Sequence, residues 1–129
     1  MDEVQIDDWS QRLDDLILKC DRQSTPPGDL LRELHDILAT GPASICSAIR
    51  PEISRSSLQR LVDIGALESA ALRLVRKCGY MLSSNGNELF VASVAVPLVG
   101  RDYSYNASSE EVALCGALAL SLQACSAAG

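Results

Sequence analysis

The fold is decided by residues 79–125, which read GYMLSSNGNELFVASVAVPLVGRDYSYNASSEEVALCGALALSLQAC. The dipeptide Asn85-Gly86 is typical of a two-residue β-hairpin turn, in which both residues adopt positive φ angles. The cross-strand pairs predicted from this turn are Leu82–Leu89 and Tyr80–Val91 on one face of the sheet and Met81–Phe90 on the other. Two antiparallel strands are therefore expected on either side of the turn.

A third strand is predicted after the hairpin. Residues 88–96 are apolar on both faces, which indicates a central strand, and Pro97 ends it. Val99 to Asn106 then predicts an edge strand that carries Tyr103 and Tyr105 on the same face. The expected sheet is three-stranded and antiparallel.

The last helix has almost no polar side. A capping box, Ser108 with Glu111, begins it, and the run 112–122 is apolar nearly throughout. Such a helix has to be covered on more than one face. Either the N-terminal helices of the same chain cover it, or a second subunit does. The residues of such a homodimer contact would be Leu114, Leu118 and Leu122.

The first 65 residues predict helices only. Apolar residues recur at helical spacing in 6–20 and 30–38. At 129 residues the chain fits one domain, 1–129. We divide it into a helical portion (1–65), an α-β-β-β-α portion (66–125) and a frayed tail (126–129). The predicted class is α+β, with a helical N-terminal half packed with the three-stranded antiparallel sheet and the C-terminal apolar helix.

Charge is unevenly spread along the chain. The net charge is −6, which disfavours broad contact with a phosphate backbone. Residues 1–15 contain six acids and one base, whereas residues 50–77 contain six bases and three acids. Two solvated helix faces are the simpler interpretation. The sharper one is that residues 50–77 form a basic patch that binds a partner. On the acidic side, a surface that contacts a basic host protein would be formed by Asp7, Asp8, Asp14 and Asp15.

Reactive side chains do not form a recognisable motif. His35 is the only histidine, and the five cysteines include no CxxC pair. The sequence also lacks a Gly-rich phosphate loop and an HExxH motif. We therefore expect no enzyme activity, no catalytic residue, no metal and no cofactor, with reduced thiols in a cytoplasmic protein. The apolar run 112–122 is too short to span a bilayer, so no membrane contact is expected.

The pattern from Ala66 to Cys125 carries a resemblance to a known family. It reads as a helix, Gly79-Tyr80, the hairpin, a third strand and the helix Glu111-Val-Ala-Leu-Cys-Gly-Ala-Leu. This order resembles the phage ABA sandwich-type proteins and related prophage-encoded small proteins of unknown function. The resemblance implies a mobile-element origin and a cytoplasmic location in a bacterial host cell, and no catalytic residue. We expect a non-enzymatic adaptor or inhibitor that contacts a host or phage protein.

The alternative function is winged-helix-like DNA binding. Residues 30–38, 43–49 and 56–64 would be its three helices, and Asn85-Gly86 would be the tip of its wing. The residues that would contact DNA are Arg50, Arg55 and Arg60. A further helix before the wing and the negative net charge count against this alternative.

Overall fold

The protein is an α+β fold, as predicted. The computed structural model describes residues 2–86, 88–97 and 101–128, and the side chains of 8–86, 88–97 and 101–126. The elements in chain order are α1 (Asp2–Arg22), α2 (Pro27–Thr40), α3 (Ala43–Cys46), the 3₁₀ helix η1 (Ser47–Ile49), α4 (Arg55–Asp63), α5 (Leu67–Val75), β1 (Gly79–Ser84), β2 (Phe90–Ala95), β3 (Asp102–Ala107) and α6 (Glu110–Ala128). The strands form one antiparallel sheet in the order β1-β2-β3, so β2 is central and β3 is an edge strand.

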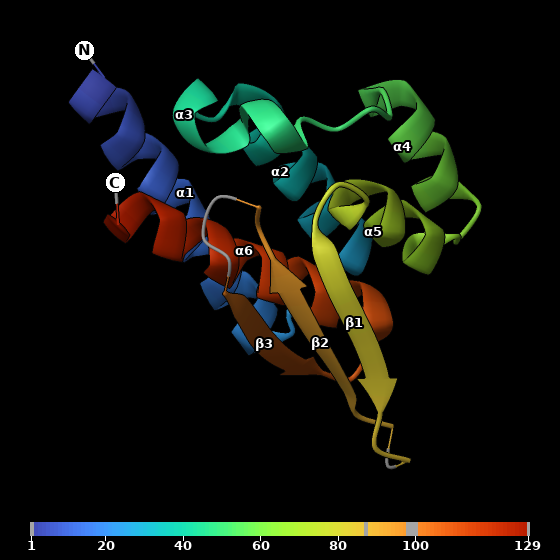
Figure 1. The fold of residues 1–129 in the computed structure, drawn as a ribbon. Coiled ribbons are helices and arrows are strands. Elements are labelled where there is room, and N and C mark those ends of the chain that lie inside the picture. The colour runs from blue at the N-terminus through green and yellow to red at the C-terminus, as the bar shows by residue number, and fades with distance from the viewer. Residues whose placement is uncertain (1, 87, 98–100, 129) are drawn as a thin grey trace.

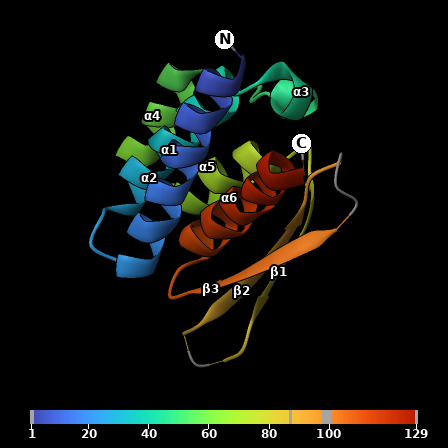
Figure 2. The same cartoon turned by 90° about the vertical axis from the view of Figure 1, so that its left-hand side faces the viewer.

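Helix α6 lies in the middle of the molecule, between the sheet and the other helices (Figures 1 and 2). It packs on β2 and β3 on one side and on α1, α2 and α5 on the others. Leu114, Leu118 and Leu122 have exposed fractions of 0%. The chain therefore covers this helix itself. The predicted homodimer contact through these three leucines is wrong, because they do not reach the surface.

Helices α1 and α2 bury one apolar stripe each, as their periodicity predicts. Spacings of three and four residues place the stripe of α1 on a single face. From residue 8 onward, where side chains are described, the buried residues of α1 are Trp9, Leu13, Leu16 and Cys20, and those of α2 include Leu30, Leu31, Leu34, Ile37 and Leu38. Ile6 of the predicted stripe lies outside the described side chains. Each buried side chain stabilises the fold by about 1.5–3 kcal/mol relative to an exposed position. Together with α6 they form one continuous core.

The predicted register of the hairpin is wrong. Its last pair is Ser84 with Phe90, so the two strands do not pair across a two-residue turn at Asn85-Gly86. Within the described part of the connection between them, Gly86 and Glu88 have positive φ angles, at 84° and 59°. The observed pairs are Tyr80–Val94, Met81–Ser93 and Leu82–Ala92.

Packing against α6 explains this difference. The register is shifted by three residues, and an odd shift exchanges the two faces of a strand relative to its partner. Ala92 and Val94 are fully buried, on the face of β2 that also carries Phe90. The longer connection therefore places Tyr80 and Leu82 on the same face of the sheet as the buried residues of β2. The local turn sequence alone does not indicate this alignment.

The sheet and α6 approach closely at Gly116. The ring of Tyr105 lies against this glycine, where a Cβ atom would overlap with the ring. The Tyr105 hydroxyl donates a hydrogen bond to Asp21 of α1, and Ser121 Oγ donates to Val94 O at 2.6 Å. The small residue at 116 thus allows β3 to contact α6 and α1 together.

Two predicted boundaries also change. The third strand begins at Asp102, and residues 99 and 100 of the predicted strand lie outside the described residues. Helix α6 continues to Ala128, so the predicted tail from 126 is helical as far as the structure describes it. The Ser126 hydroxyl lies 2.5 Å from that of Ser10 in α1, which fixes this last turn.

Candidate functional site

The segment 50–54 between η1 and α4 is held against α2 by Arg50. The guanidinium group donates to the carbonyl oxygens of Leu38, Ala39 and Gly41 at 2.9, 2.8 and 2.9 Å. Carbonyls at the end of a helix lack intrahelical partners, and the helix dipole favours a cation there. Arg50 therefore caps α2. This corrects its predicted role in contacting DNA, because its donors are engaged within the chain.

Two other side chains complete this cap. Trp9 Nε1 donates to Ile37 O at 2.9 Å, and Thr40 Oγ1 donates to Asp36 O at 2.7 Å. A Cβ atom at Gly41 would lie 2.6 Å from Trp9 Nε1, so a larger residue would displace the indole. In the sequence, the pair Gly41-Pro42 predicts the end of α2. It does not predict which side chains donate hydrogen bonds to the carbonyl oxygens at that end.

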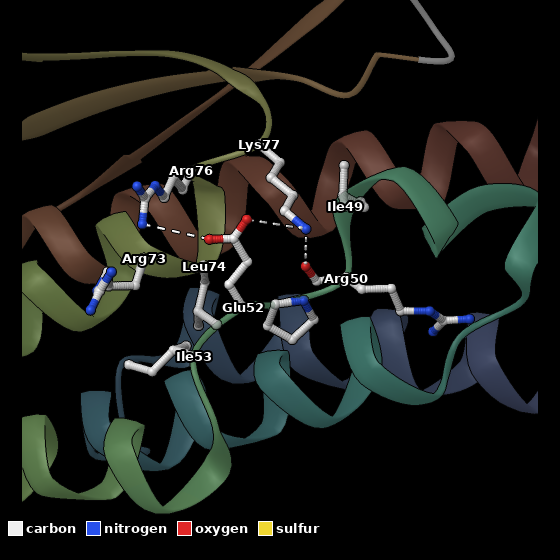
Figure 3. Close-up of a pocket in the computed structure, with 9 residues that line it drawn as sticks. Ile49, Arg50, Glu52, Ile53, Arg73, Leu74, Arg76 and Lys77 are labelled. Carbon is white, nitrogen blue, oxygen red and sulfur yellow. Dashed lines mark hydrogen bonds and ion pairs between the residues drawn. The ribbon is translucent and has the colours of Figure 1, made fainter.

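A shallow hollow lies beside this segment, between residues 49–53 and the end of α5 (Figure 3). Its volume is about 260 Å³, including its open mouth. We call it the basic hollow and define it by the apolar residues Ile49, Pro51, Ile53 and Leu74, the cations Arg73, Arg76 and Lys77, and the carboxylate of Glu52. Arg50 also lines it, but its side chain extends away from Lys77 and Glu52 (Figure 3).

Glu52 lies between two cations in the basic hollow. Its Oε1 is 3.6 Å from Lys77 Nζ and its Oε2 is 3.7 Å from Arg76 Nη1 (Figure 3). These distances are longer than a charge-assisted hydrogen bond, and the side chains of Glu52, Arg76 and Lys77 are 59%, 58% and 36% exposed. Exposed ion pairs contribute about 0–1 kcal/mol each. Glu52 is therefore loosely held.

Arg73 adds a third cation to the same hollow. It is exposed and lies on the same side of Glu52 as Arg76 (Figure 3). Among the described side chains it forms no ion pair. The spacing of Arg73, Arg76 and Lys77, at i, i+3 and i+4, is a sequence signal for a shared helix face. No sequence pattern predicts that Glu52 and the apolar residues of 49–53 lie beside these cations, because they belong to another segment of the chain.

The structure does not bring the three predicted DNA-contacting arginines together with the hairpin. Arg55 Nη2 lies 3.6 Å from Asp36 Oδ2, and Arg60 is exposed on α4. The β1–β2 loop and α4 lie at opposite ends of the molecule in both views (Figures 1 and 2). A winged-helix surface would need the wing beside the recognition helix.

The predicted acidic surface is only partly assembled on α1. Asp8, Asp14 and Asp15 are exposed, and the side chain of Asp7 lies outside the described residues. Asp14 accepts a hydrogen bond from Gln123 of α6. Asp8 and Asp15 are seven residues apart and share one helix face. Asp15 also accepts a hydrogen bond, from Gln11 Nε2 at 3.2 Å within α1. Asp8 and Asp15 are therefore the two described carboxylates that α1 displays along a common line without a hydrogen bond to another helix.

A second concavity adjoins the acidic surface. It has a volume of about 760 Å³, including its open mouth, and lies where α1 passes the end of α2. Asp8 and Arg12 line it from α1, and Pro42 and Ala43 line it from the start of α3. We call it the N-terminal groove. It places Asp8 beside a surface recess that the sequence did not predict.

The cysteines and the histidine are placed for packing. All five thiols are free and buried. Burial raises the pKa of Cys46 and of Cys78 to about 11, so both thiols stay protonated at neutral pH. His35 Nε2 donates to Ile53 O at 2.8 Å and anchors the segment 50–54. Within the described ranges, no three His, Cys, Asp or Glu side chains are grouped so that they could hold a metal ion.

Comparisons with protein-family models, with curated proteins and with solved structures found no match to this chain. None of the helices that the structure describes combines the length and the apolar character needed to cross a membrane.

Proposed function

We propose that the chain is a non-enzymatic binding protein of the phage type, which acts in the cytoplasm of a bacterial host as an adaptor or inhibitor through protein–protein contact. The observation that carries this proposal is the position of Asp8 at the N-terminal groove, with Asp15 on the same face of α1. The recess is lined by the carboxylate of Asp8 and by Arg12, whose guanidinium group donates to Thr40 Oγ1 at 3.3 Å. With Asp15 further along α1, this surface suits a partner with a basic surface.

The packing of the core supports contact through side chains at the surface. Helix α6, the most apolar element, is enclosed by its own chain and so contributes no exposed binding face. Charged side chains at the surface are the groups that would distinguish one partner from another in this proposal. In this proposal the chain binds its partner through charged surface residues, and its apolar residues form the closed core that supports them.

The double variant Asp8→Asn/Asp15→Asn tests the proposed acidic surface. The wild-type protein, immobilised and exposed to bacterial lysate, should retain a basic protein that mass spectrometry identifies. Recovery of that protein should fall by about fivefold or more with the double variant, because two charge contacts are lost.

The matched control is Asp63→Asn/Asp102→Asn, which removes two exposed carboxylates from α4 and β3 and leaves the acidic surface unchanged. Its recovery should equal that of the wild type. Equal recovery with all three proteins, or a partner lost equally with both double variants, would contradict the proposed surface.

A further inference from the structure

We propose that the basic hollow is a docking site for an acidic peptide segment of a partner protein. In the complex, a side-chain carboxylate of the segment takes the place of Glu52 between Arg76 and Lys77. A neighbouring apolar side chain of the segment lies on Pro51 and Ile53. This proposal rests on other residues than those of the acidic surface on α1, so either can fail alone.

The position of Glu52 shows which chemistry the hollow accepts. Each oxygen of its carboxylate faces one cation, Lys77 Nζ on one side and Arg76 Nη1 on the other, at 3.6 and 3.7 Å. The chain thus already contains a carboxylate in this position, on an exposed side chain whose contacts are longer than hydrogen bonds. A ligand carboxylate that approaches to hydrogen-bond distance would be bound more tightly than Glu52.

The charge balance leaves room for more than one acidic group. Three cations and a single carboxylate line the hollow: Arg76 and Lys77 pair with Glu52, and Arg73 has no ion pair among the side chains that the structure describes. Arg73 and Arg76 lie on the same side of Glu52 (Figure 3). A segment with two or more adjacent acidic residues therefore complements the hollow better than one with a single carboxylate.

The apolar part of the hollow gives such a segment a second anchor. Pro51 and Ile53 are half-buried, and Leu74 lies buried next to them. An apolar side chain of the ligand would cover the apolar surface that remains exposed there. Affinity should thus depend on the apolar residue as well as on the charges.

The backbone of segment 50–54, on one side of the hollow, is held in place before any ligand arrives. Arg50 ties its segment to the end of α2, and Lys77 Nζ donates to Arg50 O at 3.0 Å. His35 Nε2 donates to Ile53 O at 2.8 Å. This backbone loses little conformational entropy on binding, and the cost that remains is the ordering of the exposed side chains of Arg73 and Arg76.

The same observations favour a peptide over nucleic acid. A duplex gains affinity from many phosphate contacts, whereas this hollow offers three cations beside one carboxylate on a chain of net charge −6. Apolar residues in the hollow match an amino-acid side chain and do not match a phosphate backbone.

Fluorescence anisotropy with labelled synthetic peptides tests the proposal on the full chain. The first peptide has two glutamates on each side of one leucine, the second has glutamines in place of the glutamates, and the third has serine in place of the leucine. Only the first should bind saturably, at least tenfold more tightly than the others. Glu52→Gln should strengthen its binding about threefold, because the competing charge is removed.

The double variant Arg73→Ala/Arg76→Ala should weaken binding of the first peptide at least tenfold. Its matched control is Arg55→Ala/Arg60→Ala, which removes two exposed cations from α4 and should leave the affinity unchanged. Circular dichroism melting of each variant checks the fold, and Glu52→Gln tests the site without removing a cation.

Several results would overturn the proposal. One is an equal loss of peptide affinity with Arg73→Ala/Arg76→Ala and with the control pair on α4. Another is an affinity for the first peptide that does not increase with Glu52→Gln. A third is tighter binding of a labelled DNA duplex than of the first peptide. A solution mass of two chains that falls to one with Arg73→Ala/Arg76→Ala would also overturn it, because the occupant would then be a second copy of this chain. None of these results bears on Asp8 and Asp15, so failure here is distinguishable from failure of the proposed function.

Discussion

Replacing Leu118 with alanine should lower the free energy of unfolding by about 2–5 kcal/mol. Leu118 is fully buried on α6, which packs on the sheet and on α1, α2 and α5. The shortened side chain leaves a cavity that several elements border at once, so none of them can relax to fill it without losing other contacts. Urea denaturation at constant temperature measures the change.

The matched control is Leu18→Ala. Leu18 is 47% exposed on α1, so this substitution removes the same atoms from a position that is already hydrated. It should cost less than about 1 kcal/mol. Similar losses at positions 18 and 118 would mean that α6 is not enclosed as the structure shows.

Replacing Arg50 with alanine should lower the free energy of unfolding by about 2–3 kcal/mol. The guanidinium group supplies hydrogen bonds to three carbonyl oxygens at the end of α2, and its charge lies at the negative end of that helix. Arg50→Lys should recover only part of the loss, because an ammonium group cannot present the planar fork that reaches Leu38, Ala39 and Gly41 together.

Arg55→Ala provides the control for the cap. Arg55 carries the same charge five residues later, but it is 69% exposed and its one ion pair, with Asp36, spans 3.6 Å. Its loss should cost less than about 1 kcal/mol. Equal effects of the two alanine variants in urea denaturation would show that Arg50 acts through charge alone and does not cap α2.

The sequence was sufficient for the elements of this fold but insufficient for one register. Apolar periodicity located the helices, and the apolar composition of 88–96 identified β2 as the central strand. The turn at Asn85-Gly86 predicted a tight hairpin, yet the last pair of the two strands is Ser84 with Phe90. Local turn preference was overruled because Leu82, which packs against the core, has to share the face of Ala92 and Val94, and that packing exists only in the tertiary structure.

The candidate sites were less predictable than the fold. The sequence identified both charged stretches, and the basic one contains Arg73, Arg76 and Lys77. It could not show that Glu52 lies between two of these cations, because that contact joins separate segments. Arg50 was misassigned for the same reason: its charge suggested an external partner, whereas its carbonyl partners lie 9 to 12 residues earlier in the chain.

The enclosure of α6 by its own chain is tested most directly by amide hydrogen exchange along residues 113–122. Those amides should exchange only through global unfolding, with protection that matches the full free energy of unfolding measured by urea. Exchange in this helix at the rate of exposed helical amides such as those of α4, or protection that appears only at high protein concentration, would contradict the account.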